Sequence, residues 1–241
     1  MLKQILPFLI TLLAFSGLSA QNNNTASAFF KSGIDLKNKN MPQEAIVAFN
    51  KAISLSKKND SAYFEIGDIY QKGGNLDFAI LNLNKAIAIN PKNTKALFSL
   101  GKIYRDAKPN YDSALICFKK AIQVDSTNKE FFYSVAWCYN AKADYENAIA
   151  YAVKALDIDN SYKAAYGELG HAYHMSKKYA EAVEQFKKNI AISVVDLPLY
   201  YSGMCYIELK NKDEALKQYE ELKKINEKMA ESLKRSIDKM K

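Results

Sequence analysis

The sequence predicts an all-α protein built as a solenoid of six helix–turn–helix units followed by one more helix. Three observations lead to this fold class. Small residues recur along the chain with a period of about 34 residues, which is typical of stacked repeats. Long runs rich in Ala, Leu, Lys and Glu favour helices. Only nine Gly and five Pro occur in 241 residues, which is few for a protein rich in β-turns.

The repeat is defined by three columns of small residues. The first column is Gly33, Gly67, Gly101, Ala136, Gly170 and Gly203, with intervals of 34, 34, 35, 34 and 33. The second is Ala45, Ala79, Ala114, Ala148, Ala182 and Ala215. The third is Ala52, Ala86, Ala121 and Ala155, after which Asn189 and Leu222 stand in place of alanine. Such regular placement indicates a packing requirement that is repeated in every unit.

This pattern resembles the tetratricopeptide repeat family, whose helix–turn–helix unit has the same residue types at the same offsets. The resemblance covers residues 26–229 and implies a right-handed superhelical solenoid. The expected repeats are about 26–59, 60–93, 94–128, 129–162, 163–195 and 196–229. The departures are mild: only Pro91 keeps the closing proline of the family, repeat three has one extra residue near Pro109, Ala136 replaces a glycine, and Asn189 replaces an alanine.

The small residues have a physical reason. Two antiparallel helices interlock only when their axes approach to about 8–10 Å. Gly67 on the first helix of a unit and Ala79 on the second are expected at the closest approach. Ala86 is expected to serve the same purpose against the following unit. A larger side chain at these positions would push the helices apart.

Local signals mark the ends of the helices. Pro42 is expected in the first turn of its helix, where no backbone amide is missed. Residues expected to cap helix N-termini are Asn75, Asn110, Asp144 and Asn211. The segment 227–241 is expected to form a terminal helix that covers the open end of the core, with Asn226 as its cap. Its apolar side consists of Met229, Leu233, Ile237 and Met240.

The N-terminus predicts an export signal. Residues 1–20 combine a short basic start, an apolar stretch and a small-residue end, and 21–25 would form a short linker. The alternative is an uncleaved membrane anchor, but the apolar stretch is shorter than the roughly 20 residues that span a bilayer. Leu18 stands where signal peptidases prefer a small residue, so the cleavage site stays open. We expect a periplasmic or secreted protein, with a Gram-negative bacterium as the source.

Three cysteines, Cys117, Cys138 and Cys205, lie in apolar helical contexts. Buried thiols that act as small hydrophobic side chains are the favoured interpretation. A bridge between Cys117 and Cys138 is possible but not favoured.

The resemblance also implies where a partner would bind, because in this family the first helix of each unit lines the inner face. The exposed positions lie three before, one after and four after the repeat glycine. The residues selected as a partner-binding surface are Phe30, Phe64, Phe98, Lys102, Arg105, Tyr133, Trp137, Asn140, His171, His174, Tyr200 and Met204. Trp137, the only tryptophan, is the most informative, since aromatic side chains often anchor interfaces. It could instead only pack against neighbouring helices.

Two histidines, His171 and His174, are spaced i, i+3, and Met204 could approach them from the next unit. That spacing can bind a metal, but two ligands are a weak signal. We therefore predict no metal and no cofactor. The clamp of Lys and Asn side chains that some family members use for a terminal carboxylate is also not expected.

The sequence predicts a non-catalytic scaffold that binds a peptide or helix of a partner protein. Lys102 and Arg105 would attract acidic segments. No motif supports an enzyme or a small-molecule substrate. The net charge of +8 is dispersed, which disfavours nucleic acid as a partner. A structural homo-oligomer that assembles through its ends is the alternative, and membrane contact is expected only if the N-terminal segment is uncleaved.

Overall fold

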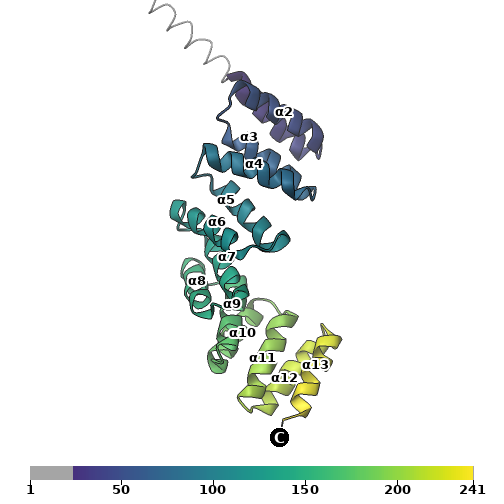
Figure 1. The fold of residues 1–241 in the computed structure, drawn as a ribbon. Coiled ribbons are helices and arrows are strands. Elements are labelled where there is room, and N and C mark those ends of the chain that lie inside the picture. Colours follow the sequence, from purple (N-terminus) through teal and green to yellow (C-terminus); the bar gives the residue numbers. More distant parts are fainter. Residues whose placement is uncertain (1–23, 241) are drawn as a thin grey trace, which may run out of the picture. The chain divides into compact units, whose positions relative to one another are not determined.

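The computed structural model describes residues 24–240. The expected signal peptide and most of the expected linker therefore lie outside the described residues. Residues 24–38 are helical. The remaining helices are α2 (Pro42–Leu55), α3 (Asp60–Lys72), α4 (Leu76–Ile89), α5 (Thr94–Lys102), α6 (Tyr111–Val124), α7 (Lys129–Ala141), α8 (Tyr145–Ile158), α9 (Lys163–Met175), α10 (Tyr179–Ile192), α11 (Asp196–Glu208), α12 (Lys212–Lys223) and α13 (Glu227–Asp238). The all-α fold class is confirmed, since the described residues contain no strand (Figure 1).

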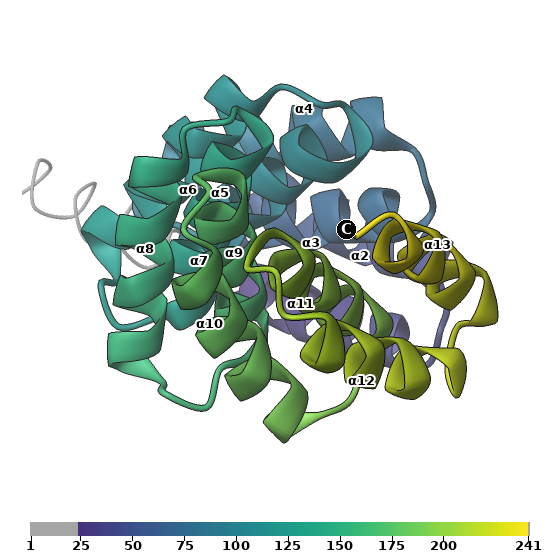
Figure 2. The ribbon, with the colours of Figure 1, turned by 90° about the horizontal axis from the view of Figure 1, so that it is seen from below.

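The chain divides into two compact units. The first ends at Ile103 and the second begins at Tyr104. Within each unit, helices that follow one another in sequence pack side by side as pairs. In the second unit the first helices of successive repeats, α7, α9 and α11, also contact one another, and α13 packs on α11 and α12 (Figure 2). Each unit therefore has a layer of first helices and a layer of second helices.

The predicted reason for the small residues is confirmed. A Cβ atom added at Gly67 would lie 2.9 Å from Leu83 Cγ on the paired helix. At Gly33 it would lie 2.6 Å from the ring of Phe49. Ala79 and Ala86 are completely buried. Real Cβ atoms do not approach other atoms this closely, so only the smallest side chains allow these helix pairs to form.

The extra residue of repeat three is absorbed by a change of helix type. Residues Ile103–Ala107 form a π-helical segment directly after α5. The Asn110 amide then donates to the carbonyl of Tyr104 across 2.7 Å. A π-helical turn holds one residue more than an α-turn, so the inserted residue does not shift the register of α6.

The predicted caps are confirmed with one exception. The side chains of Asn110, Asp144 and Asn211 accept a hydrogen bond from a backbone amide in the first turn of α6, α8 and α12. Pro42 lies in the first turn of α2. The cap predicted at Asn75 is wrong, because its side chain makes no capping hydrogen bond. Asn75 is exposed, so water can reach the free amides there.

The terminal helix α13 closes the second unit. Asn226 caps it by accepting a hydrogen bond from the Met229 amide. Leu233 and Ile237 are completely buried. A Cβ at Gly203 would lie 2.6 Å from Leu233 Cδ2, so the last repeat glycine packs against α13. The capping role predicted for this segment is therefore confirmed.

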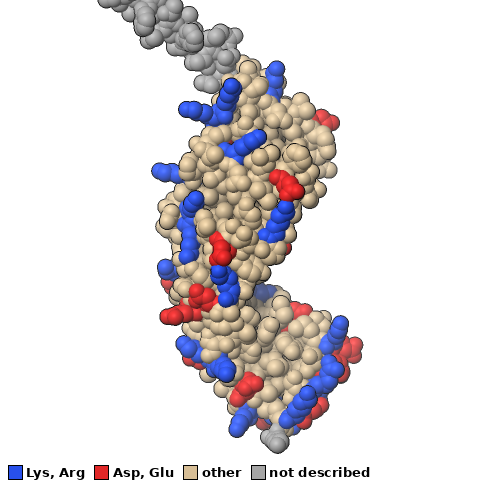
Figure 3. Space-filling model, in the orientation of Figure 1, with Lys and Arg blue, Asp and Glu red and all other residues tan. Residues whose placement is uncertain are grey.

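All three cysteines are buried free thiols. Burial raises the pKa of Cys117 to about 11 and those of Cys138 and Cys205 to about 12, so none is a reactive thiolate at neutral pH. Among the described residues, no helix is both long and apolar enough to cross a bilayer. On the face drawn in Figure 3, acidic and basic side chains are interspersed over each unit.

Candidate functional site

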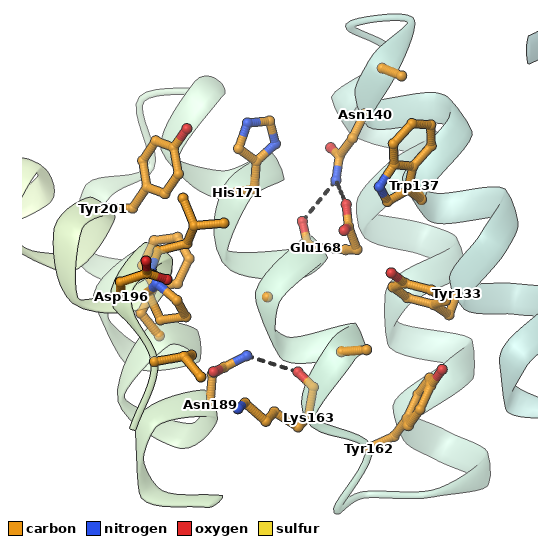
Figure 4. A pocket seen from close by; sticks show the side chains of 17 residues that line it. Tyr133, Trp137, Asn140, Tyr162, Lys163, Glu168, His171, Asn189, Asp196 and Tyr201 are labelled. Carbon is orange, nitrogen blue, oxygen red and sulfur yellow. Dashed lines mark hydrogen bonds between the residues drawn. The ribbon is translucent and has the colours of Figure 1, made fainter. Parts of the chain in front are cut away.

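The second unit contains a groove of about 730 Å³ (Figure 4). It is lined by the first helices of three consecutive repeats, α7, α9 and α11, with residues of α10 and of the two connections that precede α9 and α11. The side chains that carry its chemistry are Tyr133, Trp137, Tyr162, Glu168, His171 and Tyr201. The groove therefore lies on the helix layer that the sequence predicts for binding.

The groove exists because repeat five departs from the repeat pattern twice. Gly167 stands where the other five repeats carry Phe or Tyr, so one ring is missing from the surface of α9. Asn189 stands where four repeats carry alanine, and it lines the groove from α10. A Cβ at Gly167 would lie 3.3 Å from Asn189 Nδ2. The missing side chain leaves the space, and the larger amide forms part of its surface.

Aromatic rings line both sides of the groove. Tyr133 and Tyr162 meet edge to face with ring centres 5.7 Å apart. His171 and Tyr201 form a similar edge-to-face pair, also at 5.7 Å. Figure 4 shows the two pairs on opposite sides of α9. Burial raises the pKa of Tyr162 to about 12, so the phenol stays neutral. Burial and the charge of His174 lower the pKa of His171, which favours a neutral ring at neutral pH.

Polar groups lie between these walls. The Asn140 side-chain amide donates from Nδ2 to the Glu168 carbonyl at 3.0 Å and to the Glu168 carboxylate at 2.8 Å. Asn189 Nδ2 donates to the Lys163 carbonyl at 2.9 Å. Burial raises the pKa of Glu168, although the Asn140 hydrogen bond and the charge of Arg105 act in the opposite direction. Within residues 24–240, Glu168 forms no ion pair, so its partly buried carboxylate has only the Asn140 hydrogen bond and the more distant charge of Arg105 to stabilise it.

Trp137 is held in place by its neighbours. The Arg105 guanidinium lies 5.4 Å from the Trp137 ring centre, and Tyr111 contacts the same indole edge to face at 5.8 Å. Arg105 pairs with Asp106 through Nε and Nη2, at 2.6 and 2.8 Å, and donates to Ser134 Oγ at 3.2 Å. Only 13% of the Arg105 side chain is exposed. Arg105 therefore supports the wall of the groove from behind Trp137.

The two histidines differ in environment. His171 lines the groove, whereas His174 Nδ1 lies 3.2 Å from Cys205 Sγ outside its lining. Across the described residues, no group of three or more His, Cys, Asp or Glu side chains is arranged to hold a metal ion. The absence of a metal therefore stays a prediction. The groove itself contains carboxylate, amide, imidazole and phenol groups that can form hydrogen bonds to a bound partner.

Comparisons with known proteins agree with the repeat pattern. The family profile described as TPR repeat matches residues 67–106, and the one described as Tetratricopeptide repeat matches residues 94–128. The profile of anaphase-promoting complex, cyclosome, subunit 3 matches residues 141–222. The chain is a tetratricopeptide repeat protein. A comparison of the sequence with curated proteins found no match.

Several solved structures share the fold. YrrB, described as a TPR protein with an unusual peptide-binding site, is 21% identical with a TM-score of 0.69, covering 78% of this chain and 98% of YrrB. MamA is 27% identical with a TM-score of 0.66, covering 73% of this chain and 96% of MamA. PilF of Pseudomonas aeruginosa is 16% identical with a TM-score of 0.73, covering 89% of this chain and 99% of PilF.

Within this tetratricopeptide repeat protein, four of the residues selected from the sequence come together. Tyr133, Trp137, Asn140 and His171 all line the groove. Phe30 and Phe64 line a separate, smaller recess in the first unit. Phe98 and Lys102 are also in the first unit, with the Lys102 ammonium 5.8 Å from the Phe98 ring centre. The remaining selected residues, Arg105, His174, Tyr200 and Met204, belong to the second unit outside the lining of the groove.

Sequence reasoning did not select several residues of the groove. These are Tyr162, Lys163, Gly167, Glu168, Asn189, Asp196 and Tyr201. Gly167 and Asn189 could have been found, because Gly167 interrupts a column of Phe and Tyr and Asn189 is the first departure from the third alanine column. Tyr162 lies just before α9, and Tyr201 is the residue after Tyr200, which holds the binding position of its repeat. The family positions therefore identify neither of them. Their membership in the groove follows from how α9 and α11 pack.

Proposed function

We propose that this tetratricopeptide repeat protein is a non-catalytic scaffold that binds a peptide or helix of a partner protein in the groove of its second unit. The observation that carries the proposal is the groove itself, which has aromatic side chains on two sides and polar atoms between them. Rigid rings offer large contact areas and lose little conformational entropy on binding, so they are frequent anchors of protein interfaces. YrrB, which shares the fold, is described as having a peptide-binding site.

Export to the cell envelope is part of the proposal. It is supported by the N-terminal sequence, in which a basic start, an apolar stretch and a small-residue end precede the repeats. The partner would then be a protein of the periplasm or of the cell surface.

The binding site is tested by partner capture with groove variants. Trp137→Ala removes an aromatic wall, and Gly167→Tyr restores the ring that repeat five lacks and fills the space. Both variants are expected to weaken capture roughly 30-fold or more, as expected for a central anchor worth about 2 kcal/mol. The measurement is capture of proteins from an envelope extract of the native organism, with helical content followed by circular dichroism.

The matched control is Ile116→Ala, which shortens an apolar side chain of the same unit that is 57% exposed and outside the groove. Proteins that are retained by the wild type and by Ile116→Ala, but lost by both groove variants, support the proposal. Capture that is equal for all four proteins would show that the groove is not the binding surface.

A further inference from the structure

Two buried amide oxygens of the groove have no hydrogen-bond partner. Asn140 is 8% exposed and Asn189 is 3% exposed. Each uses its side-chain NH₂ group in a hydrogen bond to a backbone carbonyl, but Oδ1 of each accepts nothing among the described residues. A buried acceptor without a donor costs free energy, so such atoms in a folded protein require an explanation. A ligand that supplies N–H donors would provide one.

Glu168 supports the same conclusion by its charge. Its carboxylate accepts a hydrogen bond from Asn140, and no cation of the described chain pairs with it. Glu168 is partly buried, and carboxylates shielded from water are normally paired because removing their charge from water is costly. Arg105, whose charge also acts on Glu168, is already paired with Asp106. A bound cation could therefore be the ion-pair partner that this carboxylate lacks.

The surrounding rings suit a cation. The faces of Trp and Tyr rings carry partial negative charge and attract Arg and Lys side chains. Trp137 and Tyr133 lie on one side of Glu168 and His171 on the other, and Asn140 lies between Trp137 and His171 (Figure 4). Asp196 is a second carboxylate of the groove, although it accepts a hydrogen bond from Asn226 at 2.8 Å. Lys163 is the one lysine in the lining, and it lies at the Asn189 end.

We propose that the groove recognises an arginine side chain within an extended segment of a partner protein. The guanidinium stacks against Trp137, pairs with Glu168 and donates to Asn140 Oδ1. A backbone N–H of the same segment donates to Asn189 Oδ1 at the other end of the groove. Arginine fits better than lysine because its planar group presents five N–H donors in a fixed fork and stacks on rings. This inference rests on the proposed function, since it specifies what the partner presents.

The test uses a displayed library of random 12-residue peptides, selected on the full-length protein. We expect the enriched peptides to share an arginine at one position, flanked by apolar residues. A selected peptide is then synthesised with citrulline, a neutral group of the same shape, in place of that arginine. Citrulline is expected to weaken binding to the wild type by roughly tenfold or more, the loss expected for a buried charged hydrogen bond.

The variant Glu168→Gln identifies the group that recognises the arginine. The variant should bind the arginine peptide more weakly than the wild type does, by a similar factor. It should bind the citrulline peptide about as tightly as the wild type does, because Glu168→Gln and the change of arginine to citrulline remove the same interaction. The variant is expected to be at least as resistant to heat as the wild type, since it removes a partly buried charge that forms no ion pair. A purely structural role of Glu168 predicts the opposite, a loss of thermal stability.

The outcomes separate the two proposals. If peptides are enriched without a shared arginine, or if citrulline binds as tightly as arginine, this inference is wrong while the proposed function stands. If Glu168→Gln is unfolded, equal binding of arginine and citrulline peptides to the wild type still overturns the inference. If no peptide is enriched, both proposals fail.

Discussion

At the scale of single residues, close packing of the helix pairs depends on glycines, which have no side chain at the point of contact. Gly33 faces the ring of Phe49, and Gly170 faces that of Phe186, with an added Cβ at 2.6 Å in both cases. Phe49 is completely buried. The glycine costs about 1 kcal/mol of helix propensity relative to alanine, but it allows a large ring to fill the space between two helices.

Gly33→Ala is expected to destabilise the first unit by about 1–2 kcal/mol. Overpacking a core costs about 1–3 kcal/mol, and the gain in helix propensity offsets only part of that cost. The measurement is the urea midpoint of unfolding. The matched control is Gly73→Ala in the same unit, where a Cβ would lie 3.4 Å from the nearest atom, the Ile69 carbonyl oxygen, and where φ is −79°. If both variants had the same midpoint, close helix contact would not be the reason for the glycine.

At the scale of secondary-structure elements, each helix is specified by its ends and by one apolar side. The terminal helix α13 shows this most clearly, because its exposed residues are mainly charged and its buried residues are Ala230, Leu233 and Ile237. These side chains pack against Cys205, Tyr206 and Leu222 and cover the last repeat. The apolar side of α13 is therefore already buried. Homo-oligomerisation through this helix stays a prediction, and it would have to use the polar side.

Leu233→Ala is expected to destabilise the second unit by about 2–5 kcal/mol, the range for a buried leucine whose removal leaves a cavity. Chemical unfolding followed by circular dichroism measures the change. Arg235→Ala, an exposed substitution on the same helix, serves as the control and should change stability by less than about 0.5 kcal/mol. Similar small effects of both substitutions would contradict the role of α13 as the cover of the core.

At the scale of the whole molecule, the chain contains two compact units, and each has its own buried core. In the first unit the core includes Phe49, Ile66 and Ile69. In the second, the core beside α13 includes Phe186, Leu222 and Leu233. The division falls at Ile103, where the π-helical segment that absorbs the extra residue of repeat three begins. The groove lies entirely within the second unit, so the site does not depend on residues of the first.

Export is a property of the whole chain and can be tested directly. If residues 1–20 act as a signal peptide, the mature protein should be found in the envelope fraction of its native cells, with an N-terminus near Gln21. N-terminal sequencing or intact mass after cell fractionation gives the answer. Recovery of the protein from the cytosol with Met1 or Leu2 as its first residue would exclude the export proposal.

Local chemistry and periodicity made much of the fold predictable. The 34-residue period and the columns of Gly and Ala specify close helix pairs, because only small side chains permit the contact. Capping by Asn110 and Asp144 was equally predictable, since a cap acts over three residues of sequence. The lack of a capping hydrogen bond from Asn75 could not be predicted, because an exposed helix end can use water instead of a side chain.

The groove was only half predictable. Periodicity placed Tyr133, Trp137, Asn140 and His171 on the same helix layer, since side chains at fixed offsets share a face. It could not show that the missing side chain at Gly167 leaves space between α7 and α11, or that the partly buried Glu168 forms no ion pair within the described residues. Those features depend on how three helices pack. The sequence by itself determined the repeated helix pair, because its contacts are local, whereas only the tertiary structure determined the shape and charge of the groove, because cavities form between elements distant in sequence.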